Sequence, residues 1–277
     1  MSAIKIENLV RDYGGGKGVF DVSFYVNQGE AFGFLGPNGA GKTTTIRHLM
    51  GFLKPKSGRC IIDGLDCWND RDKVQARLGY IPGEISFFED MTGAEFLKFI
   101  AEYRKIGRKN RKEELLERFE LDPKSKIKKM SKGMKQKLGI AAAFMHDPDI
   151  LILDEPTSGL DPLMQNRFIE LIAEEKKHGK TILMSSHMFE EVERTCDRIG
   201  MIRKGRMVAV DGAAALRERH TRNYTVTLES ESAAEAFAID FSGVRDGLKV
   251  TVTTKQSLEE IFMDYYGGEK HDESGAL

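Results

Sequence analysis

The alternation of apolar and polar residues near the start of the chain predicts strands. Short apolar or alternating runs cover Ile4–Ile6, Val19–Val26 and Glu30–Leu35, and glycine-rich or Asn-Gln-Gly turns separate them. Cys60–Ile62 and Leu78–Ile81 are two further short apolar runs bounded by turn residues. We therefore expect strands over residues 4–35 and at these two later runs.

From about residue 92 the apolar spacing changes to that of helices. Thr92 and Glu95 form a capping-box pattern, and the apolar residues that follow lie on one helical face at Phe96, Phe99, Ile100 and Tyr103. The segments 110–120 and 131–145 also have helical spacing, with a break at Asp122-Pro123. A block of helices is thus predicted to interrupt the strands.

After this block, strands and helices alternate. The apolar run Ile150–Leu153 predicts a buried strand, and a helix is expected over 162–178 with Pro162 in its first turn. The remaining elements are expected as strand Thr181–Ser185, helix Met188–Cys196, strand Ile199–Ile202 and strand Met207–Val210. Strands that alternate with helices predict a largely parallel α/β sheet.

Beyond about residue 217 the pattern changes again. Tyr224–Leu228 and Lys249–Thr253 alternate as half-buried strands would, and Ser257–Tyr265 has amphipathic helical spacing. Gly267–Leu277 is polar and glycine-containing, and we expect it to be disordered. This part of the chain predicts a small α+β region.

Composition and charge exclude some classes of protein. The 277 residues are 40% hydrophobic and 31% charged, which is ordinary for a globular protein, and the net charge of −1 gives no reason to expect nucleic-acid binding. Cys60, Cys67 and Cys196 are an odd number with no metal-ligand spacing, which suits a reducing compartment. We identify neither a signal peptide nor an apolar run approaching the roughly 18 residues of a spanning helix.

One stretch of the sequence matches a known ligand-binding motif. Gly36-Pro37-Asn38-Gly39-Ala40-Gly41-Lys42-Thr43-Thr44 matches G-x-x-x-x-G-K-[ST], the phosphate loop of nucleoside triphosphatases. An apolar strand precedes it and a helix follows, which is the context that the motif requires. Loop N–H groups and the helix N-terminus would bind phosphates, Lys42 would reach the β- and γ-phosphates, and Thr43 would ligate Mg²⁺. The alternative is a glycine-rich structural turn.

Two carboxylates follow the apolar run Ile150–Leu153. If that strand is parallel to the strand before the phosphate loop, Asp154 lies near Thr43 and could hold Mg²⁺ through water. Glu155 is one residue further on and could polarise an attacking water. The alternative is an acidic pair that only ends a strand.

The order of the motifs resembles one protein family. The motifs are Gly36–Thr43, Ser131-x-Gly133 at a helix start, Ile150–Glu155, Ser158-Gly159-Leu160-Asp161 and Ser185-Ser186-His187. In this order and spacing the chain, over about residues 2–217, resembles the nucleotide-binding subunit of an ABC transporter. Within that family it is most similar to export-type subunits, including those for drugs, antibiotics, lipids or polysaccharides.

The resemblance implies a fold and a domain organisation. The fold would be α/β, that of a P-loop NTPase with a RecA-like parallel sheet, an antiparallel β subdomain and an inserted helical subdomain at about residues 86–147. An ATP-binding domain would span residues 1–217. A small α+β C-terminal domain would span 218–266, followed by a disordered tail at 267–277.

The resemblance also implies roles for further residues. Tyr13 matches the aromatic that stacks on adenine, although a core tyrosine is the alternative. Ser131 and Gly133 match the signature that caps the γ-phosphate of ATP bound to a second subunit. Asp161 matches the loop that crosses the dimer interface. His187 matches the switch histidine that contacts the γ-phosphate, which makes Lys42, Glu155 and His187 the expected catalytic residues.

Two positions depart from the family pattern. The usual metal-ligating glutamine after the strand Leu78–Ile81 is replaced by Gly83, and either the next residue, Glu84, or water would then fill the metal contact. In the signature, Lys132 stands at a usual glycine and Met134 at a usual glutamine. Lys132 could add charge near the phosphates or be a solvated lysine.

The expected function is that of an ATP-hydrolysing subunit that dimerises head-to-tail on binding ATP and Mg²⁺. Its partners would be a second ATP-binding subunit, identical or related, and a separate transmembrane permease. It would lie peripherally at the cytoplasmic face of the cell membrane, and no nucleic-acid partner is expected.

The alternatives are an ABC ATPase that acts on ribosomes or DNA, a kinase, and a subunit that binds ATP without hydrolysing it. A single cassette and the short 92–147 block argue against the first of these, and no acceptor site supports the second. Lys42, Asp154, Glu155 and His187 argue against the third.

Overall fold

A computed structural model describes residues 1–107, 110–213, 215–216, 221–257, 259–261 and 263 of the chain. The chain divides into two compact units, Met1–Val210 and Asp211–Leu277, so the division falls slightly before the expected boundary at residue 217. Each unit is described by itself below.

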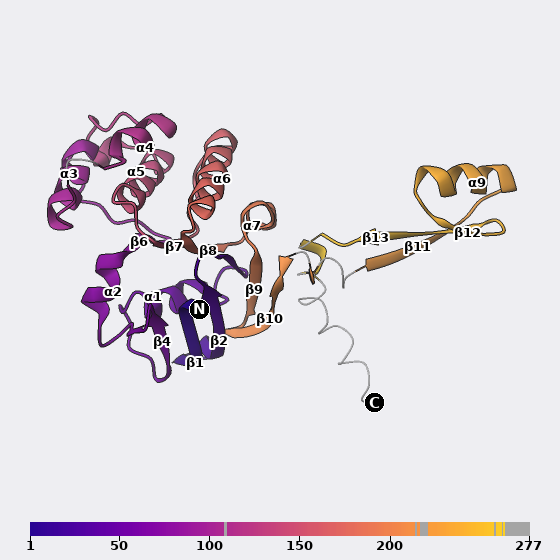
Figure 1. Cartoon of the computed structure of the whole chain (residues 1–277), viewed down its shortest axis with the longest axis horizontal. Coiled ribbons are helices and arrows are strands. Elements are labelled where there is room, and N and C mark those ends of the chain that lie inside the picture. The colour runs from indigo at the N-terminus through magenta and orange to yellow at the C-terminus, as the bar shows by residue number, and fades with distance from the viewer. Residues whose placement is uncertain (108–109, 214, 217–220, 258, 262, 264–277) are drawn as a thin grey trace. The chain divides into compact units, whose positions relative to one another are not determined.

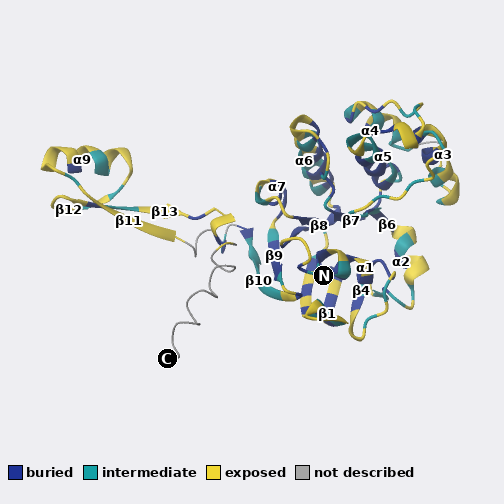
Figure 2. Cartoon of the chain, turned by 180° about the vertical axis from the view of Figure 1, so that it is seen from behind, coloured by how far each residue is buried: buried dark blue, intermediate teal, exposed yellow. Residues whose placement is uncertain are grey.

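A six-stranded sheet forms the centre of the first unit (Figure 1). Its order is β10 (Arg206–Gly212), β9 (Arg198–Arg203), β3 (Ala31–Leu35), β8 (Thr181–Ser186), β7 (Ile150–Asp154) and β6 (Leu78–Ile81). The pairs β9–β3, β3–β8, β8–β7 and β7–β6 are all parallel. Every residue of β3, β7 and β8 is buried, as expected when helices cover both faces of a parallel sheet (Figure 2).

An antiparallel sheet packs against this centre. Its order is β2 (Lys17–Asn27), β1 (Ser2–Gly14), β4 (Ser57–Ile62) and β5 (Leu65–Asp66). Ile4 on β1 lies opposite Val26 on β2 and Ile62 on β4, and all three are buried. The same apolar cluster contains Phe32 of the parallel sheet, so the two sheets share one core.

Helices cover the sheets and form the block between β6 and β7. The helices near the sheets are α1 (Lys42–Leu49), α2 (Arg71–Arg77), α6 (Pro162–Lys177) and α7 (Phe189–Thr195). The block contains α3 (Gly93–Tyr103), α4 (Lys112–Arg118), the 3-10 turn η1 (Ile127–Lys129) and α5 (Lys132–Phe144). The predicted capping box at the start of α3 is confirmed, since Thr92 and Glu95 exchange both hydrogen bonds.

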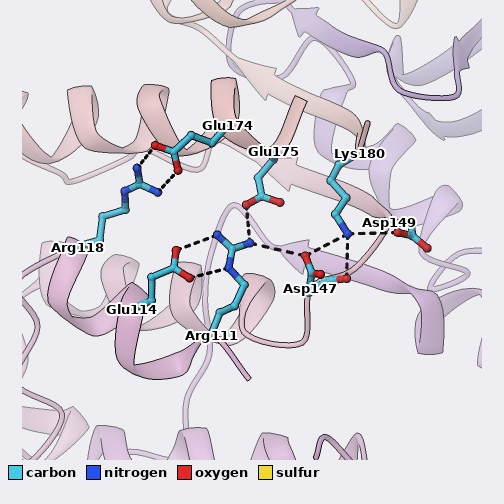
Figure 3. Close-up of polar contacts among 8 residues, drawn as sticks. All are labelled: Arg111, Glu114, Arg118, Asp147, Asp149, Glu174, Glu175 and Lys180. Atoms are coloured by element: carbon cyan, nitrogen blue, oxygen red, sulfur yellow. Dashed lines mark hydrogen bonds and ion pairs between the residues drawn. The ribbon is translucent and has the colours of Figure 1, made fainter. Parts of the chain in front are cut away.

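Ion pairs tie this helical block to α6 and to Lys180, the residue before β8 (Figure 3). Arg111, just before α4, donates to the buried carboxylate of Glu175 on α6 at 2.6 Å and also binds Glu114 at 2.9 Å. Arg118 on α4 pairs with Glu174 on α6, and this guanidinium lowers the pKa of that carboxyl. The network continues through Asp147 to Lys180, which also contacts Asp149 at 3.2 Å.

The second unit is a three-stranded antiparallel sheet with one helix. The sheet order is β11 (Thr221–Thr227), β13 (Lys249–Lys255) and β12 (Val244–Asp246), and α9 (Glu231–Asp240) packs beside β13 and β12. The predicted strand at Tyr224–Leu228 is present, but its expected half-burial is wrong because every residue of β11 is exposed. As an edge strand, β11 pairs only with β13 among the described residues.

The sequence pattern missed α2, α9, β5 and β12. Val74 is the only buried residue of α2 and Ala234 the only one of α9, so neither helix has the apolar stripe that the pattern search relies on. β5 and β12 are two and three residues long. The predicted helix Ser257–Tyr265 lies partly, and the predicted tail entirely, outside the described residues.

Within the part of the chain that the structure describes, no helix combines the length and the apolar character needed to cross a membrane.

The Arg111–Glu175 pair gives a stability prediction. The Arg111→Ala substitution would leave the Glu175 carboxylate, only 1% exposed, without its cation. We expect the free energy of unfolding to fall by about 3 kcal/mol, because an unpaired buried charge keeps its desolvation cost. Urea unfolding measures this, with Lys112→Ala as the matched control, since its partner Glu113 is 76% exposed. Equal midpoints for the two variants would contradict the prediction.

Candidate functional site

The phosphate loop lies between β3 and α1. Gly36–Gly41 leaves the buried strand and turns into the N-terminus of the helix, and Pro37, Asn38 and Gly39 are exposed. Gly41 has a φ of 114°, and a Cβ there would lie 2.8 Å from Cγ1 of Val19. Glycine is therefore required at this position by both conformation and space. The loop presents its backbone N–H groups at a helix start, where anions bind.

Lys42 is held in place although it is 4% exposed. Its ammonium donates to the carbonyl oxygens of Gly36 and Pro37, at 2.6 and 3.3 Å, and lies 3.3 Å from Oε1 of Glu155. The loop's own carbonyls thus hold the positive charge against the loop.

An open cleft of about 560 Å³ adjoins the loop. Its lining residues are Tyr13, Lys17, Gly18, Pro37, Asn38, Gly39, Gly41, Lys42, Thr43, Thr44 and Glu155. Tyr13 on β1 is half-exposed, with the Arg11 guanidinium 5.3 Å from its ring centre, so it lies at the surface of the cleft and not in the core. Sequence reasoning missed Lys17 and Gly18, although they belong to the glycine cluster that follows Tyr13.

Asp154 ends β7 and is fully buried. Its Oδ1 accepts a 2.5 Å hydrogen bond from Oγ of Ser185, the residue paired with it on β8. Among the described residues its Oδ2 has no hydrogen-bond partner, and a Cβ at Gly83 would lie 3.2 Å from it. A buried carboxylate oxygen without a donor fits the oxygen-rich coordination of Mg²⁺, with the exposed Thr43 hydroxyl as a second candidate ligand.

Glu155 lies at the mouth of the cleft in a strained conformation. Its φ is 48°, and its N–H donates to the backbone oxygen of Ser185 at 3.1 Å. Its Oε2 lies 3.4 Å from Nδ1 of His187, which is half-exposed. Strained backbone of this kind is common at functional sites. Glu155 therefore contacts Lys42 through one carboxylate oxygen and His187 through the other.

The signature residues lie at the start of α5. Ser131 caps the helix by accepting from the N–H of Met134 at 3.2 Å, and a Cβ on Gly133 would lie 2.8 Å from the Gly159 carbonyl. Lys132 is exposed, but its ammonium donates to Oγ of Ser158 at 3.0 Å. The signature helix thus packs against the loop 158–161.

Not every predicted site residue lies at the cleft. Ser131, Gly133 and Asp161 are absent from its described lining, and so are Gly36, Ala40, Asp154 and His187. The Asp161 carboxylate instead caps α6 by accepting from the N–H of Met164 at 3.0 Å. Glu84 is exposed beside Gly83. Lys42 and His187 both contact Glu155, whereas the signature helix contacts Ser158 and Gly159.

Comparison with known proteins identifies the family. Residues 19–158 match the ABC transporter family. The chain is 36% identical over 254 residues to the linearmycin resistance ATP-binding protein LnrL of Bacillus subtilis (strain 168), covering 90% of this chain and 82% of that one. It is 39% identical over 236 residues to the bacitracin transport ATP-binding protein BcrA of Bacillus licheniformis, covering 83% and 76%.

A solved structure agrees with this. An ATP-binding subunit of an ABC transporter superposes with a TM-score of 0.72 at 32% identity, covering 79% of this chain and 93% of that one. The chain therefore belongs to the ABC transporter family, as an ATP-binding and ATP-hydrolysing subunit. The family, the fold class and the ATPase activity expected from the sequence are confirmed.

The sequence motifs did not reveal that Ser185 donates a hydrogen bond to Asp154. The Ser185→Ala substitution would leave both oxygens of a buried carboxylate without a protein donor. We expect a loss of about 1–3 kcal/mol in the free energy of unfolding, the usual cost of an unsatisfied buried polar group. Denaturant unfolding measures it, with Ser57→Ala, at an exposed position of β4, as control. Identical stability in the two variants would show that Asp154 does not need this donor.

Proposed function

We propose that this chain powers the export of a small molecule by hydrolysing ATP in the cleft beside the phosphate loop. This proposal rests on the contacts of Lys42 and His187 with Glu155 beside the phosphate loop. It also rests on the buried Oδ2 of Asp154, which has no hydrogen-bond partner among the described residues. Relatives named for linearmycin resistance and bacitracin transport favour a transporter over a ribosomal or DNA-acting ATPase.

Each cleft residue has a defined role in this proposal. Tyr13 stacks on adenine, and the loop from Gly36 to Thr44 binds the phosphates through its N–H groups. Lys42 exchanges its two carbonyl acceptors for the β- and γ-phosphates. Thr43 and Asp154 would hold Mg²⁺, Asp154 through water, and water or Glu84 would take the position beside Gly83. Bound Mg²⁺ supplies charge neutralisation on the phosphate oxygens.

In this proposal, hydrolysis depends on the two loops that carry Glu155 and His187. The Glu155 carboxylate accepts a hydrogen bond from the attacking water and polarises it for in-line attack on the γ-phosphorus. His187, 3.4 Å from Glu155, donates to the γ-phosphate and positions it. Lys42 stabilises the charge that develops on the phosphate oxygens.

The site is completed by a second subunit. Ser131 and Gly133 form an N–H-rich helix start with no acidic residue in the first turn, yet they do not line the cleft of their own chain. In a head-to-tail dimer each signature would cap the γ-phosphate of the other subunit, with Asp161 at the interface. The partner is a second copy or a related ATP-binding chain.

Replacing the proposed base, Glu155, tests whether ATP binding drives dimerisation. The Glu155→Gln variant keeps the size of the side chain but loses the carboxylate that polarises water, so ATP should bind and remain intact. We expect turnover to fall by roughly a hundredfold or more and size-exclusion chromatography with ATP and Mg²⁺ to show a dimer. Lys42→Ala, which lacks the phosphate contact, is the control and should remain monomeric. Parent-level hydrolysis by Glu155→Gln would refute the assignment of the base.

The membrane partner would dock on the segment 84–100. Phe88 is 55% exposed and Phe99 40% exposed, and the two rings stack edge to face at 5.5 Å. Phe87 is half-buried, and its ring meets that of Phe96 edge to face at 5.0 Å. A cavity of about 150 Å³ lies beside it, lined by Ile85 and Phe96 among others. Exposed aromatic rings beside an apolar hollow suit a helical segment of a transmembrane permease, which would hold this chain peripherally at the cytoplasmic face.

The docking surface has its own test. In the double variant Phe88→Ser/Phe99→Ser we expect ATP binding to be retained and co-purification with the transmembrane permease to be lost, because the exposed aromatic anchors are gone. Phe241→Ser, which changes an equally exposed ring of the second unit, is the matched control. Unchanged recovery of the complex with the double variant would place the dock elsewhere.

A further inference from the structure

Tyr13 is an exposed aromatic residue near the end of a long strand. It lines the nucleotide cleft, it is 51% exposed, and it is the last residue but one of β1. The next three residues are Gly14, Gly15 and Gly16, and a Cβ built on any of them would meet no atom within 4 Å. The glycines that follow Tyr13 therefore provide no side chain that could hold its ring in place.

One side chain does contact the ring. The guanidinium of Arg11 lies 5.3 Å from the centre of the Tyr13 ring, within the roughly 6 Å over which an aromatic face attracts a cation. Such a contact suits residues two apart on one strand, whose side chains leave the same face. Among the described residues, it is the only side-chain contact of this kind that the structure gives to the Tyr13 ring.

Arg11 has no acidic partner in the part of the chain that the structure describes. Its Nε is buried and lacks a hydrogen-bond partner there. The carboxylate of its neighbour Asp12 instead accepts from the N–H of Gly14 at 2.7 Å. Buried polar groups are normally paired, so a guanidinium without an anion calls for another compensating contact. The negatively polarised face of the Tyr13 ring supplies one.

The two residues differ in their relation to the cleft. Tyr13 belongs to its described lining, whereas Arg11 does not. Arg11 is fixed by the antiparallel sheet, where it lies opposite the buried Val19 of β2. A ring that a cation holds on one face can still offer its other face to a ligand. Holding the ring before the ligand arrives also reduces the conformational freedom that is lost on binding.

We propose that Arg11 is a positioning residue for nucleotide binding: its guanidinium holds one face of the Tyr13 ring and leaves the opposite face for the adenine of ATP. The proposal rests on the proposed stacking of adenine on Tyr13. Because every base has a π-face, Arg11 would strengthen the binding of adenine and guanine nucleotides alike. It acts on the base end of the nucleotide and leaves the chemical step at the γ-phosphate unchanged.

Nucleotide affinity measures this effect. In Arg11→Ala we expect the Kd for ADP, measured by calorimetry with Mg²⁺, to rise by roughly twofold to fivefold, the size of an exposed cation–π contact. The KM for ATP should rise by a similar factor, and kcat should keep its parent value. Arg11→Met keeps apolar bulk without charge and should be as weak as Arg11→Ala. Arg11→Lys keeps a cation and should recover most of the affinity.

Three controls separate this role from other roles of a cation. Inorganic tripolyphosphate has the phosphate chain of ATP but no base, so its affinity, measured by competition with ADP, should be the same for the parent and Arg11→Ala. Arg71→Ala removes a guanidinium that lies 5.4 Å from the Trp68 ring, away from the described lining of the cleft, and should leave the Kd for ADP unchanged. The double variant Arg11→Ala/Tyr13→Ala should bind ADP no more weakly than Tyr13→Ala alone, because Arg11 acts through the ring.

The outcomes that overturn the proposal are distinct. A parent-level Kd for ADP in folded Arg11→Ala removes the positioning role. Recovery by Arg11→Met would assign the effect to packing, and equal weakening of tripolyphosphate would assign it to the phosphates. Independent, multiplying effects in the double variant would also overturn it. If Arg11→Ala does not fold, Arg11→Met and Arg11→Lys make the same comparison. Parent-level binding of ADP by Tyr13→Ala would instead disprove the proposed stacking on which Arg11 depends.

Discussion

The site depends on the register of three adjacent parallel strands. β3, β8 and β7 lie side by side, with Leu35 opposite Ser186 and Asp154 opposite Ser185. Because the carboxyl ends of parallel strands meet at one edge, the phosphate loop, the carboxylates and the histidine loop all leave the sheet together. A one-residue slip of β8 would turn Ser185 away from Asp154 and move His187 relative to Glu155.

Buried hydroxyl groups at this edge of the sheet donate hydrogen bonds to charged side chains and so fix their positions. Ser185 binds Asp154, Ser186 binds Glu191, and Lys42 is held by two carbonyls of its own loop. Asp154 and Lys42 thus have neutral hydrogen-bond partners in place beforehand, which would limit the reorganisation needed on phosphate binding. Among the described residues, Oδ2 of Asp154 and Oε1 of Glu191 have no such partner.

The inserted helical block has a different relation to the site. It enters after β6 and returns at β7, and ion pairs of Arg111 and Arg118 fasten it to α6. Ser131 and Gly133 at the start of its signature helix nevertheless do not line the cleft of their own chain. The separation within one molecule is the physical reason to expect a composite site in a dimer. The block also carries the exposed rings Phe88 and Phe99, so one subdomain would meet both the second subunit and the membrane protein.

The sequence by itself determined the features that depend on consecutive residues. The phosphate loop, the capping box at Thr92 and the buried strands before Gly36 and Asp154 follow from local conformation and apolar spacing, and the order of motifs identified the family. Short elements with little buried surface, such as α2 and α9, gave no such signal. Only the tertiary structure decided that Gly83 faces Asp154, that Lys132 binds Ser158, and that Glu191 is buried while Glu190 is not. Those facts depend on how residues far apart in the chain are brought together, and no pattern of neighbouring residues encodes that directly.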